Sequence, residues 1–166
     1  MNKKISIGEF GEKLVKHLFE KRGSTVVLSS DQFDMNKDLT IDGIETEIKT
    51  QTPFYCYKNP STKKIEESFT VPITTNTSLT VYNQLSKVLN VQQLIFVELP
   101  KKNNYIIRIF KAPDLGKRCF TVTQNEKDSR FIAAFPISEM TQLFEFDASN
   151  HKEFIDKTRI TLWSQH

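Results

Sequence analysis

The sequence predicts an α+β or α/β protein built around a mixed β-sheet. A capped amphipathic helix opens the chain, and short segments rich in β-branched and aromatic residues, separated by turn signals, follow it. A second helical pattern, over 77–89, lies between two of these segments. At 166 residues, with 38% hydrophobic and 26% charged residues, the chain is long enough for one domain with a sizeable core, and its 13 phenylalanines predict a core filled largely by rings.

The first predicted element is a helix between Ser6 and Gly23. Ser6 and Glu9 form a capping box, and Gly23 supplies the C-terminal stop. The helix carries an apolar stripe made of Ile7, Phe10, Leu14, Val15 and Leu18. A buried strand within 24–29 and a polar loop over 30–36 are expected to follow.

Asp42-Gly43 predicts a tight β-hairpin turn, because a two-residue type I′ turn needs positive φ at both central residues. The turn places Asp38 opposite Glu47 and gives each face of the hairpin a different character. The face expected to be buried carries Leu39, Ile41, Ile44, Thr46 and Ile48. The polar face carries Asp38, Thr40, Glu45, Glu47, Lys49 and Gln51.

The polar face of this hairpin allows two interpretations. Such faces are often simply exposed to solvent. However, Asp38 and Glu47 are like charges that destabilise a hairpin unless a cation compensates, and Lys49 follows on the same side. The face is therefore a candidate metal site.

The remaining elements follow from Pro53 onward, where the strand is broken. A protruding hairpin is predicted at about 53–75, around a turn rich in asparagine, proline and lysine. Beyond it, the sequence predicts a helix over 77–89, strands over 94–97, 105–110, 120–123 and 131–137, a short helix over 138–144 and a terminal strand over 159–163.

The order helix–strand–hairpin–helix–strand, with Asp38 on the second strand and Glu47-Ile48-Lys49 on the third, resembles the PD-(D/E)xK nuclease superfamily, which includes restriction endonucleases and Holliday-junction resolvases. Glu12 on the first helix is similar to the acidic residue of the resolvase-like pattern. The resemblance covers roughly residues 5–98. One departure is that Lys37 precedes Asp38 where the family has proline, which leaves Asp34 as a competing candidate; Asp38 is preferred.

The resemblance implies a restriction-endonuclease-like fold, with a mixed central sheet flanked by helices. The nuclease-like core would span 1–110, with the hairpin at about 53–75 inserted in it. The C-terminal extension, 111–166, would pack on the same domain.

The resemblance also implies a Mg²⁺-dependent DNA endonuclease, with Mn²⁺ able to substitute, that acts on duplex or branched DNA as a homodimer. Asp38, Glu47 and the Ile48 carbonyl would hold the metal through hard oxygen ligands. Lys49 would orient the attacking water or offset charge on the phosphate.

Two further residues have weaker expected roles. Glu12 would touch a metal-bound water or a second ion, but it could equally pair with Lys16 across one helical turn. Gln51 would support the nucleophile or the phosphate, or be an ordinary polar strand end.

Contacts to DNA are expected from the hairpin after the site, which combines basic and aromatic residues that could follow a phosphate backbone or enter a groove. These residues are Tyr55, Tyr57, Lys58, Lys63 and Lys64. The alternative is a solvated turn that happens to carry lysines.

Charge and cysteine content set the remaining bounds. A net charge of +3 permits nucleic-acid binding without arguing for it. Cys56 and Cys119 lack metal-ligand spacing, which predicts free thiols in a reducing compartment. No apolar run approaches the roughly 18 residues of a membrane span, and no signal segment opens the chain, so a cytoplasmic location is expected. No two of the three histidines share a metal-binding spacing, and none is assigned a role.

Two other functions stay open on the sequence. One is a catalytically inactive nuclease-fold protein that binds nucleic acid or a protein partner. The other is a small α+β binding module, in which the polar face of the hairpin would lie flat against solvent.

Overall fold

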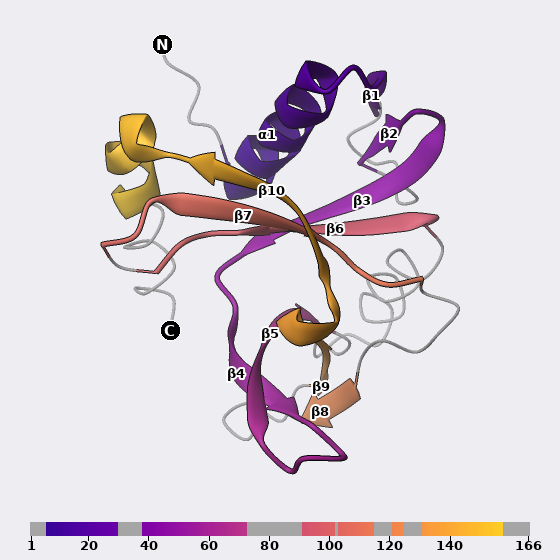
Figure 1. The fold of residues 1–166 in the computed structure, drawn as a ribbon, viewed down its shortest axis with the longest axis vertical. Helices are drawn as coiled ribbons and strands as arrows, with labels where there is room; N and C mark the ends of the chain where they lie inside the picture. Colours follow the sequence, from indigo (N-terminus) through magenta and orange to yellow (C-terminus); the bar gives the residue numbers. More distant parts are fainter. Residues whose placement is uncertain are drawn as a thin grey trace.

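The computed structural model describes residues 6–29, 38–72, 91–101, 103–114, 121–124 and 131–157. It is an α+β fold with two β-sheets (Figure 1). Its elements in chain order are α1 (Ile7–Lys21), β1 (Val26–Leu28), β2 (Leu39–Ile41), β3 (Ile44–Gln51), β4 (Phe54–Lys58), β5 (Ile65–Pro72), β6 (Gln93–Glu98), β7 (Ile106–Lys111), β8 (Thr121–Gln124), β9 (Phe131–Pro136), η1 (Ile137–Glu139), β10 (Thr141–Asp147) and η2 (Ser149–His151), after which residues 152–157 form a short helix.

The larger sheet has six strands in the order β1-β2-β3-β6-β7-β10. It is mixed, because β3 and β6 run parallel while its other neighbouring strands are antiparallel. The second sheet is antiparallel, with the order β4-β5-β9-β8. Helix α1 covers one face of the larger sheet, and the second sheet lies on the other side (Figure 1). The predicted mixed-sheet class is therefore confirmed.

Helix α1 has both predicted ends. The Glu9 amide donates to Ser6 Oγ at 3.1 Å, and Gly23 has a φ of +92°. The helix packs Leu14 and Val15 into a core that lies between it and the larger sheet. Gly11 makes the closest approach, since a Cβ at this position would lie 1.8 Å from Thr50 Oγ1 on β3. The absence of a side chain at Gly11 thus sets how near the helix can lie to the sheet.

The β2–β3 hairpin has the predicted turn and register. Asp42 and Gly43 have φ values of +49° and +81°, and Ile41 pairs with Ile44, Thr40 with Glu45 and Leu39 with Thr46. The Asp42 carboxylate also accepts from the Thr25 amide at 2.8 Å, which joins the turn to the residue before β1. The expected environments of the two faces are only partly correct. Ile44 is 42% exposed, and Glu47, on the polar face, is completely buried.

The polar face is covered at Glu47 because a second core, made largely of phenylalanine, lies between the two sheets. Phe69 on β5 stacks on Phe96 of β6, with ring centroids 4.6 Å apart and planes 7° from parallel. Phe110 and Phe135 join the same cluster. This core accounts for part of the chain's unusually high phenylalanine content.

Two predicted elements differ from the structure. The strand expected within 24–29 is not buried throughout, because β1 is an edge strand and Val27 is 60% exposed. The short helix predicted over 138–144 is instead η1 followed by β10, which pairs with β7. An irregularity in the register between Gln142 and Phe144 interrupts the alternation of side chains, so the strand lacks the two-residue period by which strands are recognised.

The hairpin predicted at 53–75 exists as β4 and β5, and β9 and β8 extend it into the second sheet. The C-terminal third of the chain supplies strands to both sheets, with β10 at the edge of the larger one. The predicted loop over 30–36, helix over 77–89 and strand over 159–163, together with Asp34 and Cys119, lie outside the described residues. Among the helices that are described, none is long and apolar enough to span a membrane.

Replacing Gly11 by alanine should destabilise the fold by about 1–3 kcal/mol, the usual cost of overpacking, because the added methyl group would clash with Thr50. Urea denaturation measures the free energy of unfolding.

Gly8 provides the control, since nothing lies within 4 Å of a Cβ at that position of the same helix. Gly8→Ala should leave stability unchanged or raise it by up to about 1 kcal/mol. Removing the opposing hydroxyl with Thr50→Ala should recover part of the Gly11→Ala loss. Equal effects of Gly11→Ala and Gly8→Ala would contradict the close approach.

Candidate functional site

Strand β3 carries Glu47 and Lys49 on the face of the larger sheet that meets the aromatic core. In the parallel register with β6, Glu47 lies beside Leu94 and Lys49 beside Phe96. Leu94 and Phe96 both belong to the phenylalanine-rich cluster between the sheets. The acidic and basic side chains of the predicted motif therefore lie at the border of an apolar layer, where charge is costly.

Glu47 and Lys49 form an ion pair within this border. Lys49 Nζ lies 2.6 Å from Glu47 Oε1, and the side chains are 30% and 0% exposed, respectively. A carboxylate taken out of water is strongly destabilised unless a cation or hydrogen bonds compensate, and the Lys49 ammonium supplies such a cation. The lysine side chain thus extends from the buried carboxylate to the surface of the protein.

Asp38 lies directly before β2 and is held against the same segment of β3. Its backbone N–H donates to the Thr46 carbonyl at 3.0 Å, and its carboxylate accepts from the Ile48 N–H at 2.8 Å. The carboxylate therefore bonds to the residue that lies between Glu47 and Lys49 in the sequence. Asp38, one of the two predicted acids, is thus hydrogen-bonded to the main chain of β3. The dipole of the Ile48 N–H partly compensates the charge of its carboxylate.

Gln51 uses its side chain to join the two sheets. Its amide nitrogen donates to the Thr70 carbonyl at 2.8 Å, and its amide oxygen accepts from the Thr70 N–H at 2.7 Å. The Gln51 side chain thus donates to and accepts from the main chain of Thr70, as a paired residue of a neighbouring strand would. Thr70 lies beyond Ser68, the last residue of β5 that pairs with β4. Gln51 is thereby placed as a continuation of the second sheet.

Glu12 lies on α1, next to Gly11 and therefore near the closest contact between that helix and β3. Helix α1 packs on the face of the sheet that carries Ile48, which is opposite to the face carrying Glu47 and Lys49. Lys16, the alternative partner expected for Glu12, bonds Glu20 one turn further along the helix.

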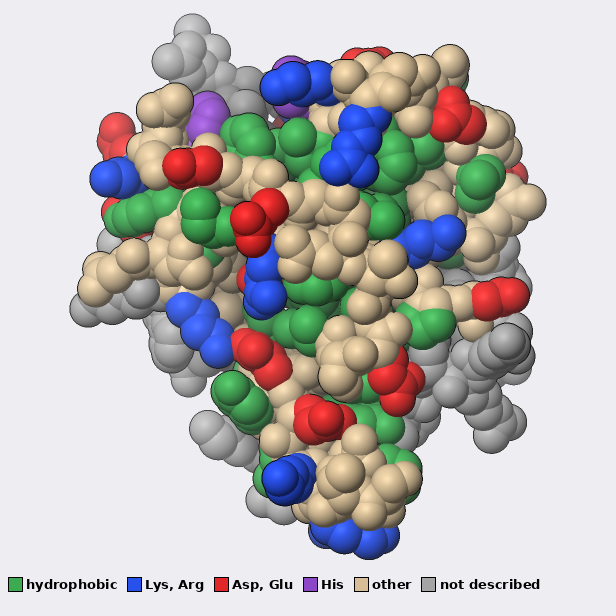
Figure 2. Space-filling model, in the orientation of Figure 1, with side chains coloured by type: hydrophobic (Ala, Val, Ile, Leu, Met, Phe, Trp, Pro, Cys, Tyr) green, Lys and Arg blue, Asp and Glu red, His purple; other side chains and the backbone are tan. Residues whose placement is uncertain are grey.

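Four of the five predicted DNA contacts are exposed on the β4–β5 hairpin. They are Tyr55, Lys58, Lys63 and Lys64, and basic side chains lie at the lower end of the molecule, where the hairpin turns (Figure 2). Tyr57 differs because it is buried. Burial, followed by the charges of Glu139 and Glu66, raises the pKa of its phenol.

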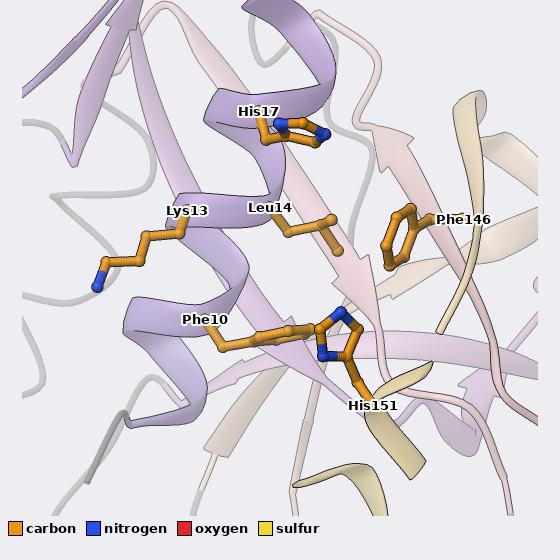
Figure 3. A pocket seen from close by; sticks show the side chains of 6 residues that line it. All are labelled: Phe10, Lys13, Leu14, His17, Phe146 and His151. Atoms are coloured by element: carbon orange, nitrogen blue, oxygen red, sulfur yellow. The ribbon is translucent and has the colours of Figure 1, made fainter. Parts of the chain in front are cut away.

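His17 and His151, two histidines without a predicted role, both line a hollow of about 260 Å³ between α1 and the segment from β10 to η2. Figure 3 shows the rings of His17 and His151 beside the space between α1 and Phe146. No short-range pattern joins residues so far apart in the chain, so sequence reasoning had no signal for this grouping. The hollow has no acidic residue among those that line it and lies on the side of the sheet away from Glu47.

The described residues around β3 offer a small set of hard oxygen ligands. Within the described part of the chain, no group of three or more His, Cys, Asp or Glu residues could hold a metal ion. Mg²⁺, however, is commonly bound through one or two carboxylates with several waters retained. Asp38, Glu47 and the Ile48 carbonyl fit that chemistry. Since the N–H and C=O of a strand residue project to the same side, the Ile48 carbonyl also faces the side on which Asp38 bonds.

Compared with models of known protein families, with curated proteins and with solved structures, the chain matches none.

Replacing Lys49 by methionine should destabilise the protein, because Glu47 would remain buried beside an apolar side chain. We expect the free energy of unfolding to fall by about 2 kcal/mol. Removing one partner of a fully buried ion pair costs about 3–5 kcal/mol, and the loss is smaller here because Lys49 is partly exposed. Thermal and urea denaturation measure the loss.

The double variant Glu47→Gln/Lys49→Met removes both charges and should recover most of that stability. The control is Lys157→Met, which removes an ammonium from an exposed pair with Glu153 and should change stability by less than about 0.5 kcal/mol. If the double variant were as unstable as the sum of its single variants, the pair would not be coupled.

Replacing Gln51 by alanine should lower the free energy of unfolding by about 1–3 kcal/mol, because both polar groups of Thr70 lose their partner. Gln142→Ala, at an exposed strand position on β10, is the matched control and should be nearly neutral. A Gln51 variant of unchanged stability would show that the bonds to Thr70 contribute little.

Proposed function

We propose that this protein is a metal-dependent nuclease of the PD-(D/E)xK type, which hydrolyses phosphodiester bonds in DNA. The observation that carries the proposal is the Glu47–Lys49 pair on β3, at 2.6 Å, beside a second carboxylate held at the intervening Ile48 amide. An acid and a lysine on β3, with a second acid bonded to the same stretch of that strand, are the groups that such a hydrolysis needs.

The arrangement of elements supports the same proposal. Helix α1 and β1 precede the β2–β3 hairpin, and β6 returns parallel to β3. Within the described residues this order agrees with the pattern on which the resemblance rests, although the helix predicted over 77–89 lies outside them. Glu47 and Lys49 are within the third strand, and Asp38 comes immediately before the second strand rather than on it. The finer assignment, a restriction-endonuclease-like fold, is part of the proposal.

Each charged side chain has a role within this proposal. Asp38 and Glu47, with the Ile48 carbonyl, would hold Mg²⁺ or Mn²⁺. Such an ion, when bound, lowers the pKa of a coordinated water and offsets charge on the phosphate. Lys49, partly exposed next to Glu47, would donate a hydrogen bond to a phosphate oxygen or hold the attacking water.

Full burial of Glu47 sets a condition on this chemistry. The Lys49 side chain is 30% exposed whereas Glu47 is 0% exposed, so we propose that substrate and metal approach from the side of Lys49. Gln51 would act by holding the second sheet in place rather than by touching the phosphate, because both ends of its amide bond Thr70.

DNA is the proposed partner, and the exposed lysines of the β4–β5 hairpin would contact its backbone. We leave Tyr57 out of this surface because its ring is buried. The proposal includes a homodimer, since members of the superfamily often cut both strands of a duplex with paired subunits.

A second candidate function is a nuclease-fold protein that binds nucleic acid without cutting it. The observation that favours it is the same buried pair, because a fully shielded carboxylate that is ion-paired with an ammonium is accommodated in the fold without any catalytic role. The third possibility, a polar hairpin face lying flat against solvent, does not agree with the complete burial of Glu47.

With Mg²⁺ or Mn²⁺, the wild-type protein should cut at least one of linear duplex, branched or single-stranded DNA. Glu47→Gln should lower the cleavage rate at least about 100-fold, as expected when a group that stabilises developing charge is lost. The double variant Glu47→Gln/Lys49→Met, in which neither charge is left unpaired, should be folded and inactive. Gel-based cleavage with and without EDTA measures the rates.

Glu153→Gln alters an exposed carboxylate in the helix at 152–157 and should keep the wild-type rate. Metal-dependent cutting that survives the double variant would exclude this site. Absence of cutting by the wild type on every substrate, together with retained DNA binding, would support the non-cutting binder.

A further inference from the structure

One face of the β4–β5 hairpin begins in the protein core and ends in solvent. Along β5, Ile65, Glu67 and Phe69 project from the same face, because side chains alternate along a strand. Phe69 is completely buried against Phe96, whereas Ile65, four residues earlier, is 62% exposed. The hairpin is therefore anchored by its inner end and presents its outer end to solvent.

The register places an aromatic ring and a lysine on this same outer end. Lys58 pairs with Ile65 and Tyr55 with Glu67, and directly opposed residues share a face. Tyr55 is 65% exposed. We call Tyr55, Lys58, Ile65 and Lys101 the hairpin platform, because Lys101 Nζ lies 5.3 Å from the centre of the Tyr55 ring.

The β4–β5 hairpin and Lys101 together carry four lysines and two glutamates. Glu67 is held by Lys101 at 2.6 Å, and Glu66 accepts from the Asn59 side chain at 3.0 Å. The hydrogen bond from Lys101 to Glu67 raises the pKa of that lysine, which keeps it charged. An exposed ring flanked by lysines suits a ligand that combines flat apolar groups with negative charge.

The turn beyond the platform has a defined shape that adds two lysines. Asn59 Oδ1 accepts from the Ser61 and Thr62 amides at 2.8 and 3.1 Å, and the Asn59 carbonyl accepts from the Lys63 amide at 2.9 Å. Lys63 and Lys64 follow at the tip, both exposed. A turn closed by these bonds presents its lysines without the ordering cost of a flexible loop.

We propose that the hairpin platform binds unpaired nucleotides, with a base stacked on Tyr55 and the backbone along the lysines, so that the substrate contains a single-stranded segment. This inference rests on the proposed function in one respect, because the bound nucleic acid is a substrate only if the protein is a nuclease. The bases of an intact duplex already stack on one another and offer no free face to the Tyr55 ring, whereas unpaired bases do. Lys58, Lys63 and Lys64 alone would serve either form of DNA, and Tyr55 is the residue that favours the unpaired one.

Binding without metal tests this inference separately from cleavage. In EDTA, fluorescence anisotropy with a labelled 20-nucleotide oligo(dT) and a labelled 20-base-pair duplex gives both dissociation constants. We expect tighter binding of oligo(dT). Tyr55→Ala should weaken oligo(dT) binding about tenfold, as expected for the loss of one stacked base, and weaken duplex binding less than about twofold. Tyr55→Phe should keep oligo(dT) binding near wild type.

Phe54→Ala is the matched control, since Phe54 is the neighbouring aromatic, 47% exposed, and pairs with Ser68 on the opposite face of the hairpin. It should leave oligo(dT) binding unchanged, and a thermal melt of each variant checks its fold. Equal effects of Tyr55→Ala and Phe54→Ala, or equal losses on both DNA forms, would overturn the proposal, as would a wild type that binds no oligo(dT).

The outcomes also separate this inference from the proposed nuclease activity. Oligo(dT) binding that depends on Tyr55, in a protein that cuts nothing, would retain the platform and reject the nuclease. Cutting of intact duplex by a protein without Tyr55-dependent binding would reject the platform and retain the nuclease. Self-association that Tyr55→Ala abolishes, without oligo(dT) binding, would identify the surface as a contact between copies of this chain and overturn the proposal.

Discussion

The rest of the structure depends on one interaction, the ion pair between the buried Glu47 and Lys49 at the border of an aromatic layer. Glu47 is fully buried, and its neighbours in the sheet belong to a cluster of phenylalanines and aliphatic residues. Such a carboxylate is tolerated only with compensation, which Lys49 provides at 2.6 Å. Any function assigned to β3 has to respect this constraint, because moving Lys49 away would leave the buried carboxylate without a compensating charge and destabilise the protein.

A second acid–base pair at the far end of β6 shows that burial alone does not mark a site. Glu98 is also buried, and Arg108 holds it through two bonds of 2.7 and 2.6 Å. Both carboxylate oxygens are bonded by one guanidinium, and this bonding raises the pKa of Arg108. Glu47 differs because its partner is a lysine rather than a bidentate guanidinium, and because the Asp38 carboxylate is held at the adjacent Ile48 amide. That difference is why we place the chemistry at Glu47.

The two sheets form one body through contacts that are polar at the edge and aromatic at the centre. Gln51 joins β3 to β5 with two hydrogen bonds, and the Phe69–Phe96 stack fills the space between the layers. The hairpin that carries Tyr55 thus takes its direction from the same strand that carries Glu47 and Lys49. The hairpin and the charged residues of β3 are therefore connected through the same contacts between the sheets.

The sequence by itself determined the local features of this protein. The capped helix and the register of the β2–β3 hairpin follow from Ser6, Glu9, Asp42 and Gly43, because caps and tight turns are formed by residues close together in the chain. Only the tertiary structure decided that the hairpin's polar face is buried at Glu47, that Gln51 serves Thr70, and that residues 141–147 form a strand at the sheet edge. Each of these depends on partners distant in the sequence, or on a register irregularity that hides the strand period. The sequence pattern could therefore identify Asp38, Glu47 and Lys49 as candidates, but not the apolar layer in which they lie.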